Sequence, residues 1–318
     1  MHHLTALEAF VVVVDTGSFT AAAAELGVSK SHVSKLVSGL EDMLGVRLLH
    51  RTTRRLSLSD VGRAFYERCA RALEEITDAE QAVTEASDSP RGTLRVSVPL
   101  SFGTRYIAPL VSEFVAQYPH LRVEMDFSDR RVHLIDEGFD LVVRIGSLED
   151  SSHIARRIAP TRGYLVASPG YLAARGVPQS PRDLKDHDCI LYALSSSGPT
   201  WSFTTPDGGR TAVRVHGRVT MNNGDGIVAA ASAGLGIARL PDFLVADALA
   251  DGRVVALLRD HLDGDRAIWA VYPHTRHLAT RVRRFVDFLV ERLGDDCPWM
   301  RDANEAIEQA DAPSTGDG

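Results

Sequence analysis

Residues 18–36 read SFTAAAAELGVSKSHVSKL, and this stretch decides how the N-terminal part of the chain folds. Ser18 can cap a helix running through Thr20–Leu26, because its hydroxyl can accept a hydrogen bond from a free amide of the first turn. Gly27 then supplies a left-handed turn that ends this helix. A second helix follows at once and is expected to reach Leu44.

The two predicted helices carry small or apolar residues where they must pack together. Ala23 lies where the helices have to approach closely, and Val33 and Leu36 lie on the inner face of the second helix. Either Ser29 or Ser31 can cap that second helix. Together with the turn glycine, these constrained positions predict a helix-turn-helix.

The outer face of the second helix is rich in groups that bind DNA. An ordinary helical hairpin would need the apolar positions, but it would not need a basic, hydroxyl-rich outer face. Lysine can donate to guanine, while serine and histidine can reach base edges or phosphates. The expected DNA contacts on this helix are Ser29, Lys30, Ser31, His32, Ser34 and Lys35.

A basic hairpin follows the second helix. Residues 45–58 read GVRLLHRTTRRLSL, are closed by Ser59, and alternate like two short strands around a basic tip. Such a wing would lie on phosphate or in an adjacent minor groove, although a solvated surface hairpin is the simpler alternative. The wing residues expected to contact DNA are Arg51, Thr52, Arg54 and Arg55.

The net charge of −7 over 318 residues is unevenly distributed. Residues 28–71 contain nine Lys or Arg against four Asp or Glu, so the segment expected to bind DNA is locally basic. Residues 295–318 contain seven acids and one Arg, with Gly, Ser and Pro near the end. We expect this tail to be disordered, and its composition indicates no role.

The cysteines and the hydropathy indicate an intracellular protein. Cys69, Cys189 and Cys297 are far apart and have no metal-ligand spacing, which is typical of reduced thiols. No leader peptide precedes the helix expected at Leu4–Val14, and no apolar run reaches membrane length. The sequence therefore predicts a cytoplasmic protein with no membrane partner.

A long helix is expected to follow the wing. Ser59-Asp-Val-Gly can open it, with Asp60 near its positive end, and Pro90 and Gly92 would end it and form a hinge. Apolar residues recur along it at spacings of four and three, which favours a dimerisation seam over a helix that only covers its own domain. The seam consists of Phe65, Cys69, Ala72, Ile76, Ala79, Val83 and Ala86. A dimer would present two recognition helices to two half-sites.

These N-terminal motifs resemble those of the LysR-type transcriptional regulators. They are Phe19-Thr-Ala-Ala-Ala, Leu26-Gly-Val-Ser, Val33-Ser-Lys, Leu40-Glu, Leu44-Gly-Val-Arg-Leu, Arg51-Thr-Thr-Arg and Leu58-Ser-Asp-Val-Gly62. The resemblance covers about residues 1–293, is strongest before residue 65, and includes the later phrase DLVVRIG at residues 140–146. Many relatives have Gln, Pro and Ala where this chain has Lys30, Ser31 and His32, so an operator sequence cannot be carried over.

Residues 92–293 alternate strand and helix patterns, which indicates α/β layers with mainly parallel sheets. The expected strands are Leu94–Pro99, Val123–Phe127, Leu141–Ile145, Tyr164–Ser168 and Ile268–Tyr272. The expected helices are Tyr106–Gln117, Arg131–Glu137, Gly226–Ala233, Pro241–Ala250 and a last one carrying Val282, Phe285, Val286, Leu289 and Leu293. The stretch Ala233-Gly-Leu-Gly-Ile is expected to be a helix stop and tight return, not a phosphate cradle, because it follows a helix.

The C-terminal two-thirds should form two lobes, with the chain crossing near 159–163 and returning near 264–267. The resemblance implies the same architecture, a periplasmic-binding-protein-like sensor with a cleft between its lobes. The predicted fold is thus an all-α winged helix-turn-helix with a long linker helix, followed by a two-lobed α/β domain. The expected domains are 1–60 for DNA binding, 61–90 for the linker helix, 91–294 for effector binding (lobe I 91–161 and 266–294, lobe II 162–265), and 295–318 for the tail.

Ligands of such domains lie at the carboxyl ends of strands, where free amides can hold an anion. Ser101 follows the first strand directly and is the strongest candidate contact, although it and Ser128 could be simple caps and Arg144 could pair with a neighbouring acid. The effector is therefore expected to be a small organic acid. The full set of expected effector contacts is Ser101, Phe102, Thr104, Ser128, Arg144, Gly146, Asn222 and Asn223.

The alternative classes are an enzyme or a two-lobed carrier with an added interaction domain. The chain has no nucleophile elbow, no Walker loop and no dinucleotide fingerprint after a strand, and a carrier would need an export signal. His274 and His277 lack nearby carboxylates and are not expected to bind a metal. We therefore predict a non-enzymatic, sequence-specific transcription regulator without cofactor or metal. Its expected partners are an interrupted palindrome in duplex DNA, a small-molecule effector, a second copy in dimers and tetramers, and, as the resemblance allows, RNA polymerase.

Overall fold

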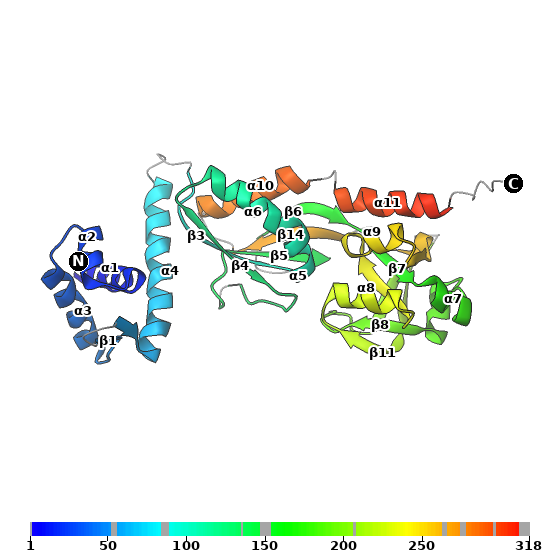
Figure 1. The fold of residues 1–318 in the computed structure, drawn as a ribbon, viewed down its shortest axis with the longest axis horizontal. Helices are drawn as coiled ribbons and strands as arrows, with labels where there is room; N and C mark the ends of the chain where they lie inside the picture. Colours follow the sequence, from blue (N-terminus) through cyan, green and yellow to red (C-terminus); the bar gives the residue numbers. More distant parts are fainter. Residues whose placement is uncertain are drawn as a thin grey trace. The chain divides into compact units, whose positions relative to one another are not determined.

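The computed structural model divides into two compact units, Met1–Asp88 and Ser89–Gly318, and each is described by itself (Figure 1). The structure describes residues 2–51, 56–83, 89–134, 136–146, 154–205, 208–262, 266–273, 278–294 and 297–311.

The N-terminal unit is a winged helix-turn-helix followed by a long helix. Its elements are α1 (His2–Thr16), α2 (Phe19–Glu25), α3 (Lys30–Leu44), β1 (Leu49–Arg51), β2 (Leu56–Leu58) and α4 (Asp60–Val83). Ser18 caps α2 by accepting from two amides, and Gly27 makes the left-handed turn with φ of +66°, both as expected. Of the two candidate caps for α3, Ser29 holds the position and accepts from the amide of His32.

The core of this unit lies where α1 meets α2, α3 and α4. Phe10, Val33 and Leu40 are fully buried there, and Ala23 is buried where the sequence places the closest helix approach. The small side chain at position 23 allows the two helices of the motif to pack at short range, so the outer face of α3 is left for solvent.

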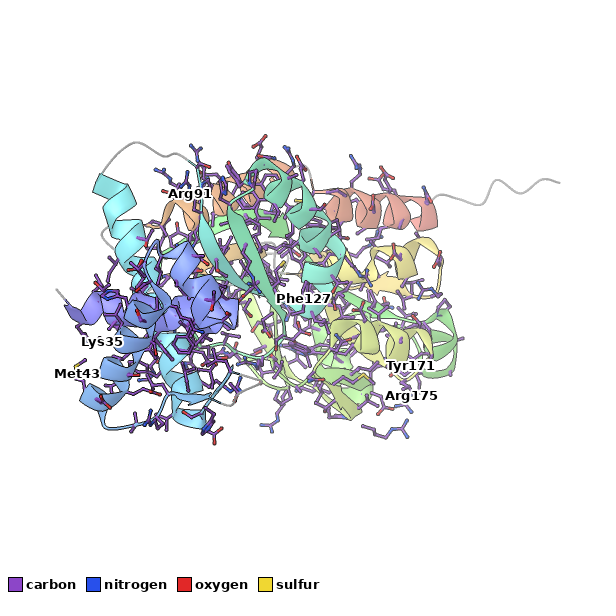
Figure 2. All side chains as sticks on the ribbon, turned by 60° about the vertical axis from the view of Figure 1, so that its left-hand side comes forward. Lys35, Met43, Arg91, Phe127, Tyr171 and Arg175 are labelled. Atoms are coloured by element: carbon purple, nitrogen blue, oxygen red, sulfur yellow. The ribbon has the colours of Figure 1, made fainter. Side chains whose placement is uncertain are left out.

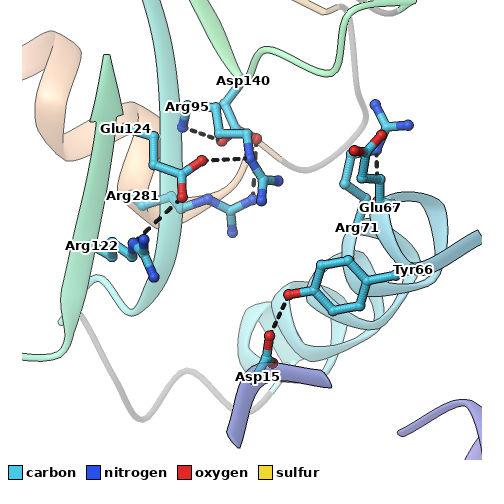
Figure 3. A network of polar contacts seen from close by, with 9 residues as sticks. All are labelled: Asp15, Tyr66, Glu67, Arg71, Arg95, Arg122, Glu124, Asp140 and Arg281. Atoms are coloured by element: carbon cyan, nitrogen blue, oxygen red, sulfur yellow. Dashed lines mark hydrogen bonds and ion pairs between the residues drawn. The ribbon is translucent and has the colours of Figure 1, made fainter. Parts of the chain in front are cut away.

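Lobe I of the C-terminal unit is built on a five-stranded sheet with the order β4-β3-β5-β14-β6. The strands are β3 (Gly92–Val98), β4 (Leu121–Phe127), β5 (Leu141–Gly146), β6 (Ile154–Thr161) and β14 (Arg266–Tyr272). Asp140 helps to fix this sheet, since its carboxylate accepts from the amide of Arg95 at 2.8 Å and from Arg281 at 3.1 Å (Figure 3).

Lobe II contains a second five-stranded sheet with the order β11-β8-β12-β7-β13. Its strands are β7 (Gly163–Ala167), β8 (Asp188–Tyr192), β11 (His216–Met221), β12 (Ile237–Pro241) and β13 (Val255–Leu257), beside a hairpin of β9 (Thr200–Thr204) and β10 (Arg210–Arg214). The expectation of mainly parallel sheets is wrong. Each sheet has two parallel and two antiparallel pairings, because β7 and β14, the strands on which the chain enters each lobe, run against the others.

Helices cover both sheets of the C-terminal unit. They are α5 (Leu100–Phe102), the π-helical η1 (Gly103–Ile107), α6 (Ala108–Gln117), α7 (Pro169–Arg175), η2 (Pro181–Asp186), α8 (Gly224–Ser232), α9 (Asp242–Ala250), η3 (Arg259–His261), α10 (Thr280–Leu293) and α11 (Pro298–Asp311). One continuous core joins lobe I residues such as Leu94 and Phe102 to lobe II residues such as Ile227 and Leu244. The lobes are therefore packed directly on each other along part of their boundary.

The helix expected at Arg131–Glu137 is wrong for the described residues of this stretch, which form an irregular loop (131–133) and turns (134, 136 and 137). The Glu137 carboxylate accepts from the amide of His133 at 2.9 Å and pairs with Arg130, and these contacts lower the pKa of Glu137 to about 2. A side chain that binds a local amide competes with helical hydrogen bonding, which accounts for the turn.

The expectation that residues 295–318 are disordered is wrong for residues 297–311. Pro298–Asp311 form α11, which packs along α9. Trp299 is fully buried and its indole nitrogen donates to the carbonyl of Pro160 at 3.3 Å, while Cys297 and Ala303 are also buried. The helix forms despite its acidic composition, because its apolar stripe packs on an apolar surface of lobe II.

Among the described residues, no single helix is long and apolar enough to cross a membrane. In the part of the chain that the structure describes, only α1 and α2 taken together have the length and composition, and they are bent by 120° at their junction.

Candidate DNA interface and effector site

The outer face of α3 is open to solvent in this structure. Lys30, His32 and Lys35 are exposed, as are Ser29 and Ser31. The structure thus places these five predicted DNA contacts on one accessible surface, while Val33 and Val37 hold the opposite face of the helix in the core. Lys35 can be followed on α3 in Figure 2.

The three serines among the predicted contacts on α3 differ in their surroundings from Lys30, His32 and Lys35. Ser34 is half-buried, so less of its side chain is offered to a duplex. Ser29 and Ser31 share a hydrogen bond of 3.0 Å between their hydroxyls, and Ser29 is also occupied as the cap of α3. Both keep a free lone pair or proton for a phosphate at the helix start.

The expected wing strands are present. β1 pairs antiparallel with β2, and the backbone of Arg51 is opposite Leu56. Thr52, Arg54 and Arg55 lie outside the described residues. Their contacts with DNA remain predictions.

A buried carboxylate in the Leu40-Glu motif, whose structural role the sequence did not predict, fixes α3 to the wing. Glu41 is 2% exposed, and its Oε1 accepts from the amides of Leu48 at 2.8 Å and Leu49 at 3.0 Å. Its Oε2 lies 3.2 Å from Arg47. Since β1 begins at Leu49, this one side chain sets the position of the wing relative to the recognition helix.

A glycine contact locks the start of α4 against the same loop. A Cβ on Gly62 would lie 2.0 Å from the carbonyl oxygen of Leu48, so only glycine fits there. Ser59 donates to the carbonyl of Arg47 at 2.7 Å and accepts from the amide of Gly62. The wing, α3 and α4 therefore form one rigid frame.

The seam of α4 is divided between two environments. Phe65 and Cys69 pack into the core of their own unit, where the ring of Phe65 is 5.8 Å from that of Phe10. Tyr66 donates to Asp15 of α1 on the same side (Figure 3). The first part of α4 therefore covers its own domain, which was the alternative to a dimerisation seam. Ala72 and Ile76 are exposed, and for the remaining seam residues the structure describes no side chain.

The predicted effector contact Ser101 lies at the boundary between the lobes. Its side chain is buried and its hydroxyl donates to Asp225 of α8 at 2.5 Å. Arg105, one turn further along the same segment, also pairs with Asp225 and donates to the carbonyl of Phe243 at 3.2 Å. Segment 100–107 of lobe I thus meets the start of α8 in lobe II.

A second carboxylate, that of Asp129 in lobe I, also contacts lobe II where segment 100–107 meets α8. Asp129 accepts from the amide of Leu100 at 3.0 Å, and it also accepts from the side chain of Asn223, the cap of α8. Burial raises the pKa of Asp129, although both hydrogen bonds act in the opposite direction. Asp129 and Asp225 are therefore functional candidates that sequence reasoning missed. The acid directly after Ser128 and the one two residues after Asn223 were the available signal.

Other predicted effector contacts are not assembled with Ser101. Arg144 shares a face of β5 with Val142, and its guanidinium donates to the carbonyl of Val132 at 3.0 Å. Phe102 is fully buried in the core on the opposite face of the sheet, where its ring contacts those of Tyr106 and Trp299. Arg144 thus belongs to a different surface from Phe102.

The remaining predicted contacts are only loosely related to the site. Thr104 and Asn222 are exposed, and Ser128 is half-buried with its hydroxyl 3.4 Å from the amide of Arg130. Gly146 ends β5 with φ of +131°, and its carbonyl accepts from the indole of Trp269 at 3.0 Å. Ser101 and Asn223 are the two predicted contacts that the structure brings to the meeting of the lobes.

A buried acid holds the crossing between the lobes. Asp242 is fully buried and accepts from the hydroxyl of Thr161 at 2.6 Å and from the amide of Arg162 at 2.8 Å. Arg162 separates β6 from β7, so this is the residue at which the chain changes lobe, within the range expected from the sequence. Burial raises the pKa of Asp242. The contact fixes the start of α9 to the crossing point.

A winged helix-turn-helix with an open basic face, joined to a two-lobed α/β domain, defines a DNA-binding regulator with a ligand-binding domain. Residues 4–63 match the family model described as bacterial regulatory helix-turn-helix protein, lysR family, and residues 87–294 match the LysR substrate binding domain. The chain belongs to the LysR-type family and is a DNA-binding transcription regulator.

Named relatives align along nearly the whole chain. The chain is 37% identical over 291 residues to the HTH-type transcriptional regulator CrgA of Neisseria meningitidis serogroup C, covering 91% of this chain and 97% of that one. It is 38% identical to an uncharacterized HTH-type transcriptional regulator of Haemophilus influenzae, covering 89% and 98%. The solved structure of CrgA matches with a TM-score of 0.57 at 36% identity, covering 92% of this chain and 99% of that one.

Proposed function

We propose that the chain binds an interrupted palindrome in duplex DNA as a homodimer, with dimers paired into tetramers, in the bacterial cytoplasm. The exposed face of α3, held in place by the buried Glu41 anchor, is the observation that carries this proposal. Lys30, Ser31, His32 and Lys35 would enter the major groove, and the wing arginines would contact phosphate. Two half-sites require two copies, which favours a dimer through the exposed part of α4.

We further propose that the effector is a small organic acid bound where segment 100–107 meets α8. The groups that would hold its carboxylate are the hydroxyl of Ser101, the guanidinium of Arg105 and the amide of Leu100. In the structure all three already bind carboxylates, those of Asp225 and Asp129. An effector carboxylate would replace Asp225 on Ser101 and Arg105, and Asp225 would move away with lobe II.

Such a replacement would change the angle between the lobes and so the spacing of the paired DNA-binding units. A ligand shifts a conformational equilibrium only as far as it binds one state better than the other. A change in the spacing of the DNA-binding units would alter the bend of the bound promoter, and with it transcription by RNA polymerase.

The DNA part is tested by fluorescence anisotropy on the promoter nearest to the chain's own gene, over a range of salt concentrations. Binding should weaken steeply with salt, because phosphate contacts dominate affinity. Arg54→Ala should weaken binding to all duplexes about equally. A change in base preference alone would show that the wing assignment is wrong.

The effector part is tested by thermal-shift screening of carboxylates against uncharged amides of the same shape. Asp225→Asn should strengthen the binding of the carboxylates, since it removes a competing negative charge. Asp247→Asn is the matched control, because Asp247 also pairs with Arg105, at 3.7 Å, but is largely exposed. A screen in which only uncharged compounds bound would refute the organic acid.

A further inference from the structure

Lobe II contains a cavity that is separate from the meeting of the lobes. Its volume is about 650 Å³, within the range of small-molecule sites. Its walls come from α7, the start of β8, β11, the end of α8 and the loop before β13. None of the predicted effector contacts lines it. Figure 2 shows two of its residues, Tyr171 and Arg175, on α7.

Three arginines from three separate elements line this cavity. Arg175 lies at the end of α7, Arg218 in β11 and Arg253 before β13, and Asp188 is the one acid that lines the same walls in the described part of the chain. Three guanidinium groups against one carboxylate give the walls an excess of positive charge. Residues distant in sequence converge here only through the fold.

The contacts of these arginines leave them able to bind a ligand. Arg218 is 3.7 Å from Asp188 and 82% exposed, so this ion pair is weak. Arg175 donates to the backbone carbonyl of Asp186 at 3.2 Å, which occupies only one of its five N–H groups. Arg253 pairs at the surface with the exposed Asp251, two residues earlier in the chain.

A buried polar atom without a hydrogen-bond partner among the described residues lies behind the cavity wall. It is the hydroxyl oxygen of Ser232. The oxygen has almost no accessible surface, so Ser232 contributes to the wall of the cavity through its other atoms. Ser232 ends α8 directly before the turn that closes this side of the cavity.

That turn is Ala233-Gly-Leu-Gly, which the sequence predicts to be a helix stop and return. The structure confirms the turn, with φ of +83° at Gly234. A Cβ on Gly236 would lie 2.3 Å from the carbonyl oxygen of Asp188, so the turn is pressed onto β8. The same turn forms one wall of the cavity, although it is not itself the group that would hold an anion.

The floor of the cavity is preorganised. The hydroxyl of buried Tyr171 accepts from the amide of Asp188 at 3.0 Å and is 3.1 Å from Nδ1 of His187. Burial raises the pKa of Tyr171, and it lowers the pKa of His187. Both groups are thus held uncharged at neutral pH, and the charge of the site comes from its arginines.

We propose that this cavity binds a small molecule carrying a phosphate group or two carboxylates. Its anionic groups would lie between Arg175, Arg218 and Arg253. The site is independent of the proposed effector site and of its ligand.

The test is calorimetric titration of the full chain with inorganic phosphate and, separately, with succinate, with chloride adjusted to constant ionic strength. The double variant Arg175→Gln, Arg218→Gln should weaken binding more than tenfold. Ser232→Ala should leave binding unchanged within about twofold, because its hydroxyl oxygen is not accessible from the cavity. The control is Arg210→Gln, Arg214→Gln, which removes two exposed arginines of the same lobe outside the cavity.

Saturable phosphate binding that the double variant loses would support a phosphate-bearing ligand, and the same result with succinate would support a dicarboxylate. The proposal is overturned if neither anion saturates, or if the double variant and the control bind equally. Because α3 also attracts phosphate, only the binding step that the double variant removes counts for this cavity.

Discussion

Replacing Glu41 tests the link between the recognition helix and the wing. In Glu41→Ala the amides of Leu48 and Leu49 lose their acceptor while they remain buried. A hydrogen bond to a charged group contributes about 1.5–3 kcal/mol, so losing two should cost about 3 kcal/mol or more. Glu41→Gln keeps an acceptor oxygen in the same place and should cost about 1 kcal/mol.

Amide hydrogen exchange of the full chain, read by mass spectrometry over residues 45–60, measures this cost locally. A loss of 3 kcal/mol corresponds to about a hundredfold faster exchange, and 1 kcal/mol to about fivefold. Asp42→Ala is the matched control, because Asp42 is the exposed neighbour of Glu41. If Glu41→Ala exchanged within twofold of Asp42→Ala, the proposed anchor would be refuted.

Three further predictions concern separate parts of the chain. Lys35→Ala should weaken binding to the chain's own promoter, measured by fluorescence anisotropy. If Lys35 contacts phosphate, the slope of log binding constant against log salt concentration should also decrease by about 1. An unchanged affinity would contradict the α3 interface. Trp299→Ala should lower the free energy of unfolding by about 3–5 kcal/mol in urea titrations, because a fully buried indole is lost, whereas exposed Glu308→Ala should change it by less than about 0.5 kcal/mol. Burial raises the pKa of Tyr106 to about 12, so its contribution to stability is present below pH 10 and is lost as the pH rises toward 12. Tyr106→Phe should therefore lose less stability than the wild type between pH 10 and 12 in thermal melts, and equal losses would contradict the assignment.

Local signals accounted for most of the N-terminal unit. Ser18, Gly27 and Ser29 act within a few residues of themselves, and a cap or a left-handed turn needs no distant partner. Glu41 belongs to the Leu40-Glu motif, but its structural role was not predicted because nothing local shows that it is buried. Its role depends on amides seven and eight residues later, which the wing brings back to the end of α3.

The C-terminal tail shows how composition can mislead. Its excess of acids predicted disorder, yet Trp299, Ala303 and Ala306 recur at spacings of four and three and are buried. That stripe was visible in the sequence, but the surface of α9 that it covers was not. A short amphipathic helix is stable only when such a surface exists.

The effector site was the part that sequence could predict least. Ser101 and Asn223 were expected from strand ends and helix starts, and the structure does bring them to one place. Arg144 was grouped with them on the same grounds. The alternation of β5 instead turns its side chain to the other face of the sheet, beside Val132.

The sequence alone determined the helix-turn-helix, the two-lobed domain and the membership of the LysR-type family, because caps, turns and apolar periods act over short distances and recur as fixed motifs. Only the tertiary structure showed that Asp129 and Asp225 accept the hydrogen bonds of Leu100 and Ser101 where the lobes meet. It also showed that Asp242 binds the backbone where the chain passes from one lobe to the other, and that three arginines of lobe II line one cavity. These are contacts between residues far apart in the chain. Their partners are selected by packing and burial, which no local pattern encodes.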